Sequence, residues 1–251
     1  MKTTEEMIRE MVRRCEFCVV DLDQCIYPRF TQTTLGRLLL IRSLNPRYWR
    51  FLPRLLAGAG YISRTRSAQL WGRHATNHEL MTAFCQVITG FPLKLVEELS
   101  LRMPGMGPQT WREALCKISL QMDVYLLTFS IEPLARAYGM AQDKRGRRIF
   151  EGWRGTPLED NGGVITCADF SPYTLSAPAK LETLENLMRD RGFNHPLIIG
   201  HGEDEAGMAV RARKLGGGSI GLIKPGDNVE DFELQLPGDA WRSIASALKE
   251  E

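Results

Sequence analysis

Phe17-Cys18-Val19-Val20-Asp21-Leu22-Asp23 is the stretch of sequence that decides the fold. Four apolar residues run directly into two carboxylates at positions i and i+2, and a short apolar run bounded by polar residues is typical of a buried strand. In α/β proteins, ligands bind beyond the carboxyl ends of parallel strands. We therefore expect Asp21 and Asp23 to point toward one site, where they would suit a cation or act as a nucleophile and a proton donor.

The rest of the chain predicts more strands of the same kind, alternating with helices. Short apolar runs at 124–128, 197–200 and 219–223 are each followed by a helical pattern. Residues 154–167 read as a hairpin with Asn161-Gly162 as its turn. The alternation predicts an α/β fold with a doubly wound parallel sheet.

A long helical segment interrupts this alternation. From Thr34 to about Ser119 the apolar residues have helical spacing, and Pro and Gly clusters separate the helices. We expect an inserted α-helical subdomain over residues 29–118, with the α/β core formed by residues 1–28 and 119–251.

The charge distribution distinguishes the inserted segment from the remainder. The chain has 251 residues and a net charge of +2, yet no acidic residue and nine arginines lie between Asp23 and Glu79. This asymmetry indicates an anionic partner. Arginine-lined solvent faces of a helical subdomain are the simpler interpretation, peripheral membrane contact is the alternative, and nucleic-acid binding is disfavoured because the apolar residues are needed in the subdomain's own core.

No stretch predicts export or membrane insertion. The N-terminus is charged and lacks an apolar signal region, and no apolar run approaches 18 residues. The six cysteines lack the spacing of a disulfide framework, so we expect a cytoplasmic protein without transmembrane segments. No motif decides the oligomeric state.

Other chemically useful side chains occur where the predicted strands end or the helices begin. The set comprises Thr128, Lys180, His201, Glu203, Asp204 and Glu205. Together with Asp21 and Asp23 they supply a nucleophile, an acid/base, a hydroxyl and an ammonium. Phosphoryl transfer requires these parts.

The arrangement resembles the haloacid dehalogenase-like (HAD) hydrolase superfamily, and most of all its branch that includes phosphoserine phosphatase. The first motif, Asp-x-Asp-x-Thr/Val, is similar to Asp21-Leu-Asp23-Gln-Cys25. The second, an apolar strand ending in Ser/Thr, is similar to Leu126-Leu127-Thr128, and the third, a lysine opening a helix, to Ala179-Lys180. The helical insertion lies where such enzymes carry a cap.

The resemblance implies a phosphatase acting on a small phosphorylated substrate. Asp21 would form an aspartyl-phosphate, Asp23 would be the general acid/base, and Thr128 and Lys180 would bind the phosphoryl oxygens. A divalent metal, expected to be Mg²⁺, would be held by Asp21 and Asp23.

The fourth motif departs from the family pattern Gly-Asp-x-x-x-Asp. Gly200-His201 places an imidazole at the metal position, so His201, Asp204 and Glu205 are further candidate ligands and Mn²⁺ or another ion is an alternative to Mg²⁺. Three hypotheses follow: a working phosphatase with a carboxylate from residues 203–205, a site retuned to a softer ion, or a degenerate protein that binds an anionic ligand or partner without turnover.

Overall fold

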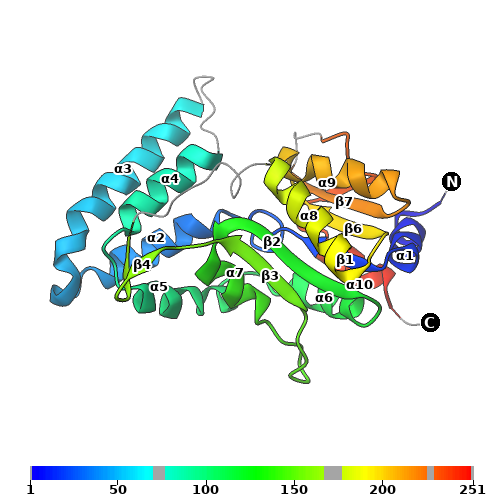
Figure 1. Ribbon diagram of the computed structural model, residues 1–251, viewed down its shortest axis with the longest axis horizontal. Helices are drawn as coiled ribbons and strands as arrows, with labels where there is room; N and C mark the ends of the chain where they lie inside the picture. The colour runs from blue at the N-terminus through cyan, green and yellow to red at the C-terminus, as the bar shows by residue number, and fades with distance from the viewer. Residues whose placement is uncertain (1, 70–76, 167–176, 225–228, 250–251) are drawn as a thin grey trace.

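A six-stranded parallel sheet forms the centre of the molecule (Figure 1). The computed structural model describes residues 2–69, 77–166, 177–224 and 229–249. The strand order is β3-β2-β1-β6-β7-β8, and each neighbouring pair is parallel. The strands are β1 (Phe17–Val20), β2 (Asp123–Ile131), β3 (Gly152–Thr156), β6 (Pro196–Gly200), β7 (Gly218–Ile223) and β8 (Leu234–Pro237). The predicted parallel α/β sheet is confirmed.

Helices cover both faces of the sheet. On one face lie α8 (Ala177–Arg191) and α9 (Glu203–Lys214), and on the other lie α1 (Thr4–Arg14), α6 (Thr110–Ser119), α7 (Glu132–Gly139) and α10 (Trp241–Ala247). Alternate residues of β1 serve the two faces: Phe17 and Val19 pack toward α8 and α9, and Cys18 and Val20 toward the opposite layer. Strands buried on both faces explain the continuous apolar runs.

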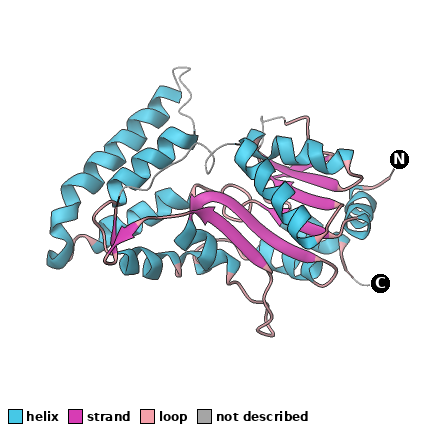
Figure 2. Cartoon of the chain, viewed as in Figure 1, coloured by secondary structure: helices cyan, strands magenta, loops and turns pink. Residues whose placement is uncertain are grey.

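The segment between β1 and β2 is helical (Figure 2). It contains α2 (Thr31–Arg42), the 3₁₀ helix η1 (Pro46–Phe51), α3 (Leu52–Gln69), α4 (Asn77–Ile88), α5 (Leu93–Ser100) and the 3₁₀ turn η2 (Met103–Gly105). The last helix before β2, α6, packs against α10 and β2 of the sheet layer. The division at residues 29–118 stays a prediction, and no helix in the described ranges is long and apolar enough to cross a membrane.

The predicted hairpin is shorter than expected. Its strands are β4 (Asp160–Asn161) and β5 (Val164–Ile165), and the turn is Gly162-Gly163, one residue later than predicted, since both glycines have positive φ (62° and 80°). Residues 154–156, assigned to the hairpin from the sequence, instead belong to β3 and pair with β2 in the main sheet. The hairpin contacts the α4–α5 loop, where Gly90 N donates to Ile165 O.

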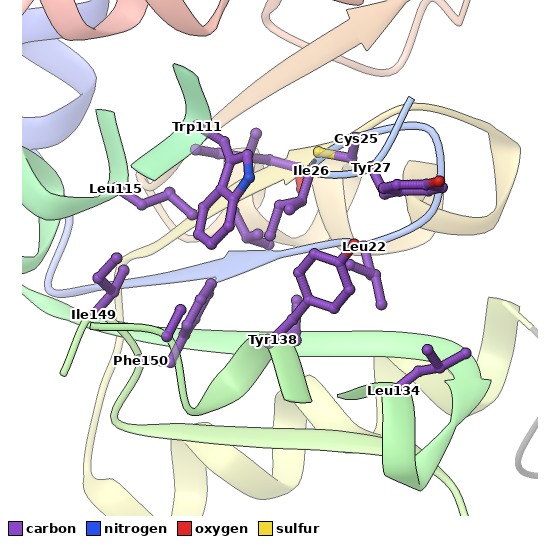
Figure 3. Close-up of a cluster of buried hydrophobic side chains, with 14 of the residues drawn as sticks. Leu22, Cys25, Ile26, Tyr27, Trp111, Leu115, Leu134, Tyr138, Ile149 and Phe150 are labelled. Carbon is purple, nitrogen blue, oxygen red and sulfur yellow. Dashed lines mark hydrogen bonds between the residues drawn. The ribbon is translucent and has the colours of Figure 1, made fainter. Parts of the chain in front are cut away.

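The loop after β1, residues 21–27, packs into the hydrophobic core. Figure 3 shows Leu22, Cys25, Ile26 and Tyr27 among side chains of α6 and α7, and these loop residues are at most 8% exposed. Trp241 Nε1 donates a hydrogen bond of 3.0 Å to the Cys25 carbonyl. The backbone that carries Asp21 and Asp23 is therefore positioned by packing against α6, α7 and α10 on one face of the sheet.

Candidate active site

Lys180 joins two carboxylates at the carboxyl edge of the sheet. It lies in the first turn of α8, is 3% exposed, and donates to Asp21 Oδ1 at 2.9 Å and to Glu205 Oε1. Burial alone would lower the pKa of Lys180, but the charges of Asp21 and Glu205 reverse this effect and raise it, so the ammonium stays charged. The result is a buried, fixed positive charge beside Asp21.

Glu205 is held from its other side by backbone amides. Its Oε2 accepts hydrogen bonds from His201 N at 3.3 Å and Gly202 N at 3.2 Å at the start of α9. A Cβ at Gly200 would lie 2.5 Å from Glu205 Cγ, so only glycine at the end of β6 leaves room for this side chain. Burial raises the pKa of Glu205 despite the opposing charge of Lys180.

His201 contacts the second oxygen of Asp21. Its Nδ1 lies 3.2 Å from Asp21 Oδ2, and its Nε2 lies 3.1 Å from the side-chain nitrogen of Gln24. Gln24 has the left-handed φ of 58°, which is uncommon for a residue with a side chain. Burial opposes the charged imidazole, but the hydrogen bond and charge of Asp21 raise the pKa of His201.

The pKa of Asp21 is lowered as a consequence. Burial favours its neutral form, yet Lys180 and His201 outweigh that effect and keep the carboxylate ionised. An ionised carboxylate at a strand end, beside a buried ammonium, is suited to attack an electrophilic phosphorus atom.

Asp23 lies in a different environment. Its Oδ1 accepts from Thr31 N at 2.6 Å, and its Oδ2 accepts from Ser130 Oγ at 2.8 Å. Burial raises the pKa of Asp23, the charge of Asp21 adds to this, and the two hydrogen bonds only partly compensate. A carboxyl group that retains its proton to higher pH is suited to general acid catalysis.

Thr128 lies near Lys180 and is 4% exposed. Its Oγ1 accepts a hydrogen bond from Ser130 N at 3.1 Å. Together with Lys180 and Arg154 it lines a narrow cavity of about 20 Å³, next to Phe129, whose ring centroid is 4.2 Å from Lys180 Nζ. Phosphoryl binding by Thr128 stays a prediction.

The structure brings four of the sequence-predicted residues into contact. Asp21, Lys180, His201 and Glu205 form one hydrogen-bonded cluster, which we call the Asp21 cluster. Asp23 lies beside it with its own partners. Asp204 is on the first turn of α9 but is not one of the three metal-compatible side chains, Asp21, His201 and Glu205, found in the described part of the chain.

Sequence reasoning missed several residues of the site. These are Gln24, Thr31, Ser130 and Arg154. The Thr128-x-Ser130 spacing was a usable signal, because it repeats on β2 the i, i+2 arrangement of Asp21 and Asp23. The remaining three depend on contacts between distant segments.

A divalent ion fits the Asp21 cluster if it accepts an imidazole ligand. Asp21, His201 and Glu205 each offer a ligand atom, and these atoms lie within 4.8 Å of one another. Mg²⁺ prefers an all-oxygen shell, whereas Mn²⁺ and Zn²⁺ accept imidazole. The donor set therefore fits an imidazole-accepting ion better than Mg²⁺, and such an ion would share the two carboxylates with Lys180.

Several solved structures have the same fold. A phospho-aspartyl intermediate analogue of phosphoserine phosphatase aligns over 94% of this chain and 100% of its own, with a TM-score of 0.60 and 14% identity. A substrate-bound phosphoserine phosphatase aligns over 94% and 99%, with a TM-score of 0.63 and 15% identity. A HAD family hydrolase from Salmonella enterica subsp. enterica serovar Typhi aligns over 100% and 82%, with a TM-score of 0.63 and 12% identity.

No protein-family model matches the sequence, and no curated protein matches it either. At identities of 12–15% the structural likeness establishes a HAD-like fold. The chemistry must then be inferred from the side chains of the site.

Proposed function

We propose that this chain is a HAD-superfamily phosphatase that hydrolyses a phosphomonoester of a small molecule through an aspartyl-phosphate on Asp21. The observation that supports this most is the Asp21 cluster beside Asp23. One carboxyl group has a lowered pKa and its neighbour a raised pKa, which is the division that a nucleophile and a general acid require.

The first step forms the aspartyl-phosphate. An Asp21 oxygen attacks phosphorus, the bond from phosphorus to the ester oxygen breaks, and Asp23 gives its proton to that leaving oxygen. Lys180, and Thr128 if its hydroxyl turns toward the substrate, would bind the oxygens on which charge accumulates.

The second step releases phosphate. Asp23, now ionised, takes a proton from a water molecule whose oxygen attacks phosphorus. The bond between phosphorus and Asp21 breaks, so inorganic phosphate leaves and both carboxyl groups return to their initial protonation states. Ser130 and Thr31 N would stabilise the ionised form of Asp23 between the two steps.

A divalent ion would be held by Asp21 and His201, with Glu205 as a third ligand. When bound, it would neutralise phosphoryl charge during transfer. We infer that this ion is Mn²⁺ or another imidazole-accepting ion. The helices of residues 29–118 would act as the cap over the site.

The test is a panel of small phosphomonoesters assayed with Mg²⁺, Mn²⁺ and Zn²⁺. Asp21→Asn is expected to lower kcat by at least about a thousandfold and to prevent trapping of phosphoenzyme in acid. Asp23→Asn is expected to slow turnover by about a hundredfold or more. Asp190→Asn, an exposed acid on α8, is the control and should match the wild type.

A second function is favoured by one observation. The metal-compatible set beside Asp21 contains the imidazole of His201 where the family pattern has an aspartate, so the site lacks the all-oxygen shell that Mg²⁺ prefers. A degenerate protein that binds an anionic ligand without turnover would show no hydrolysis anywhere in the panel. Wild-type activity that persists in Asp21→Asn would contradict the proposed mechanism.

A further inference from the structure

Exposed apolar side chains gather at one corner of the molecule. Of the nine large apolar side chains exposed in the described residues, four lie within residues 41–56: Ile41, Leu44, Trp49 and Leu56, at 54–65% exposure. They lie where α2 ends, along η1 and on the first turns of α3. This corner is remote from both chain termini (Figure 1). We call these residues the corner patch.

Exposed arginines occur in the same segment as the corner patch. Arg42, Arg47, Arg50 and Arg54 are exposed, and the sequence contains no carboxylate between Asp23 and Glu79. Within the described residues no ion pair joins Arg42, Arg47 or Arg50 to an acid. The charge of this corner is therefore available to a negatively charged partner.

The local structure holds these groups in place. Trp49 Nε1 donates to the Leu44 carbonyl at 2.9 Å, which joins two of the exposed apolar residues across the α2–η1 turn. The guanidinium groups of Arg42 and Arg47 lie 5.8 and 5.7 Å from the centre of the Tyr48 ring. Apolar and cationic groups are thus presented together before any partner binds.

We propose that the corner patch docks the protein onto an anionic lipid surface. Apolar side chains can enter the boundary between headgroups and acyl chains while neighbouring arginines bind lipid phosphates. A tryptophan with a satisfied indole N–H is suited to this boundary.

Two other partners fit less well. A nucleic acid would use arginines and aromatic faces, but the Tyr48 ring already faces two guanidinium groups, and Ile41, Leu44 and Leu56 would gain no stacking. A second copy docked patch to patch would place arginines against arginines. The combination of aliphatic side chains with uncompensated positive charge favours lipid.

The experiment is co-sedimentation of the full chain with vesicles of phosphatidylcholine alone or mixed with phosphatidylglycerol. We expect binding to the mixed vesicles only, weakened by salt. Leu44→Ser/Trp49→Ser and, separately, Arg47→Glu/Arg50→Glu should each weaken binding by about tenfold or more. Circular dichroism and the melting temperature check that each variant is folded.

Matched controls lie elsewhere on the surface. Leu120→Ser replaces a side chain that is 59% exposed outside the corner patch, and Arg148→Glu reverses an exposed arginine. Both should bind within twofold of the wild type. Equal binding to phosphatidylcholine alone, or patch variants that bind like the controls, would overturn the proposal. So would displacement of the vesicles by a single-stranded oligonucleotide, or a dimer that disappears in the patch variants.

Discussion

Asp21 and Asp23 are two residues apart and both are almost fully buried, yet their hydrogen-bond partners differ in kind. Around Asp21, α8 and the β6–α9 turn supply an ammonium and an imidazole. Around Asp23, α2 and β2 supply an amide and a hydroxyl, which carry no charge. The pKa of Asp21 is lowered and that of Asp23 is raised. Burial acts on both residues alike, so the neighbouring charges decide the difference.

Removing the ammonium beside Asp21 should have the largest effect on stability. Lys180→Met leaves Asp21 and Glu205 buried without their shared counter-charge. We expect the free energy of unfolding at pH 7 to fall by about 3 kcal/mol, measured by urea denaturation, and kcat/KM to fall by about a hundredfold. Lys214→Met, at an exposed position of α9, should change neither quantity. An unchanged unfolding curve for Lys180→Met would show that the cluster is not formed.

The two aspartates should differ in the sign of their effect on stability. At pH 7, Asp21→Asn should lower the free energy of unfolding by about 2 kcal/mol, because it removes an ionised partner of Lys180 and His201. Asp23→Asn should raise it by about 1 kcal/mol, because it removes a carboxylate whose ionisation burial disfavours, while an amide oxygen still accepts from Thr31 N.

The pH dependence of these differences follows from the pKa directions. The stability gained by Asp23→Asn shrinks as pH falls through the pKa of Asp23 in the folded protein, because the wild-type carboxyl group becomes neutral there. The loss in Asp21→Asn persists to lower pH, because the folded pKa of Asp21 lies below its ordinary value. If both substitutions changed the free energy of unfolding at pH 7 in the same direction, the contrast between the two aspartates would be contradicted.

His201→Asp makes the ligand set of the Asp21 cluster all oxygen. We expect the ratio of activity with Mg²⁺ to activity with Mn²⁺ to rise by about tenfold. His195→Asn is the matched control, because that histidine pairs with Glu16 outside the site. A wild type that already works best with Mg²⁺ would refute this assignment.

Ser130→Ala tests the uncharged hydrogen-bond donors around Asp23 and should have the smallest effect of these substitutions. The Ser130 hydroxyl stabilises the ionised form of Asp23, so its loss raises the pKa of Asp23 further. The alkaline limb of the kcat/KM profile should move up by about one pH unit. Ser119→Ala, which removes a hydroxyl bonded to Cys116 O, should leave the profile in place.

The sequence predicted the centre of the sheet better than its edges. The apolar runs at 17–20, 197–200 and 219–223 lie within a residue of β1, β6 and β7, because strands buried on both faces are continuously apolar. The edge strands were not predicted correctly: residues 154–156 of β3 were assigned to the hairpin, and β8, which is mostly exposed or half-buried, was missed. Neither has the continuous apolar run of a strand that is buried on both faces.

The same contrast holds within the site. Asp21, Lys180 and Glu205 could be named from the sequence because each has a chemically distinctive side chain at an element boundary. Ser130 and the Thr31 amide could not, because their role depends on the start of α2 meeting the end of β2. A backbone amide has no side-chain signature at all.

The 2.6 Å bond from Thr31 N to Asp23 Oδ1 has a mechanical consequence. Thr31 is the first residue of α2, so the proton affinity of Asp23 depends on where that helix sits. If α2 swings outward, the carboxylate loses an amide donor and holds its proton more tightly; when α2 returns, the proton is released more readily. The position of α2 and proton transfer from Asp23 are thereby coupled through this hydrogen bond.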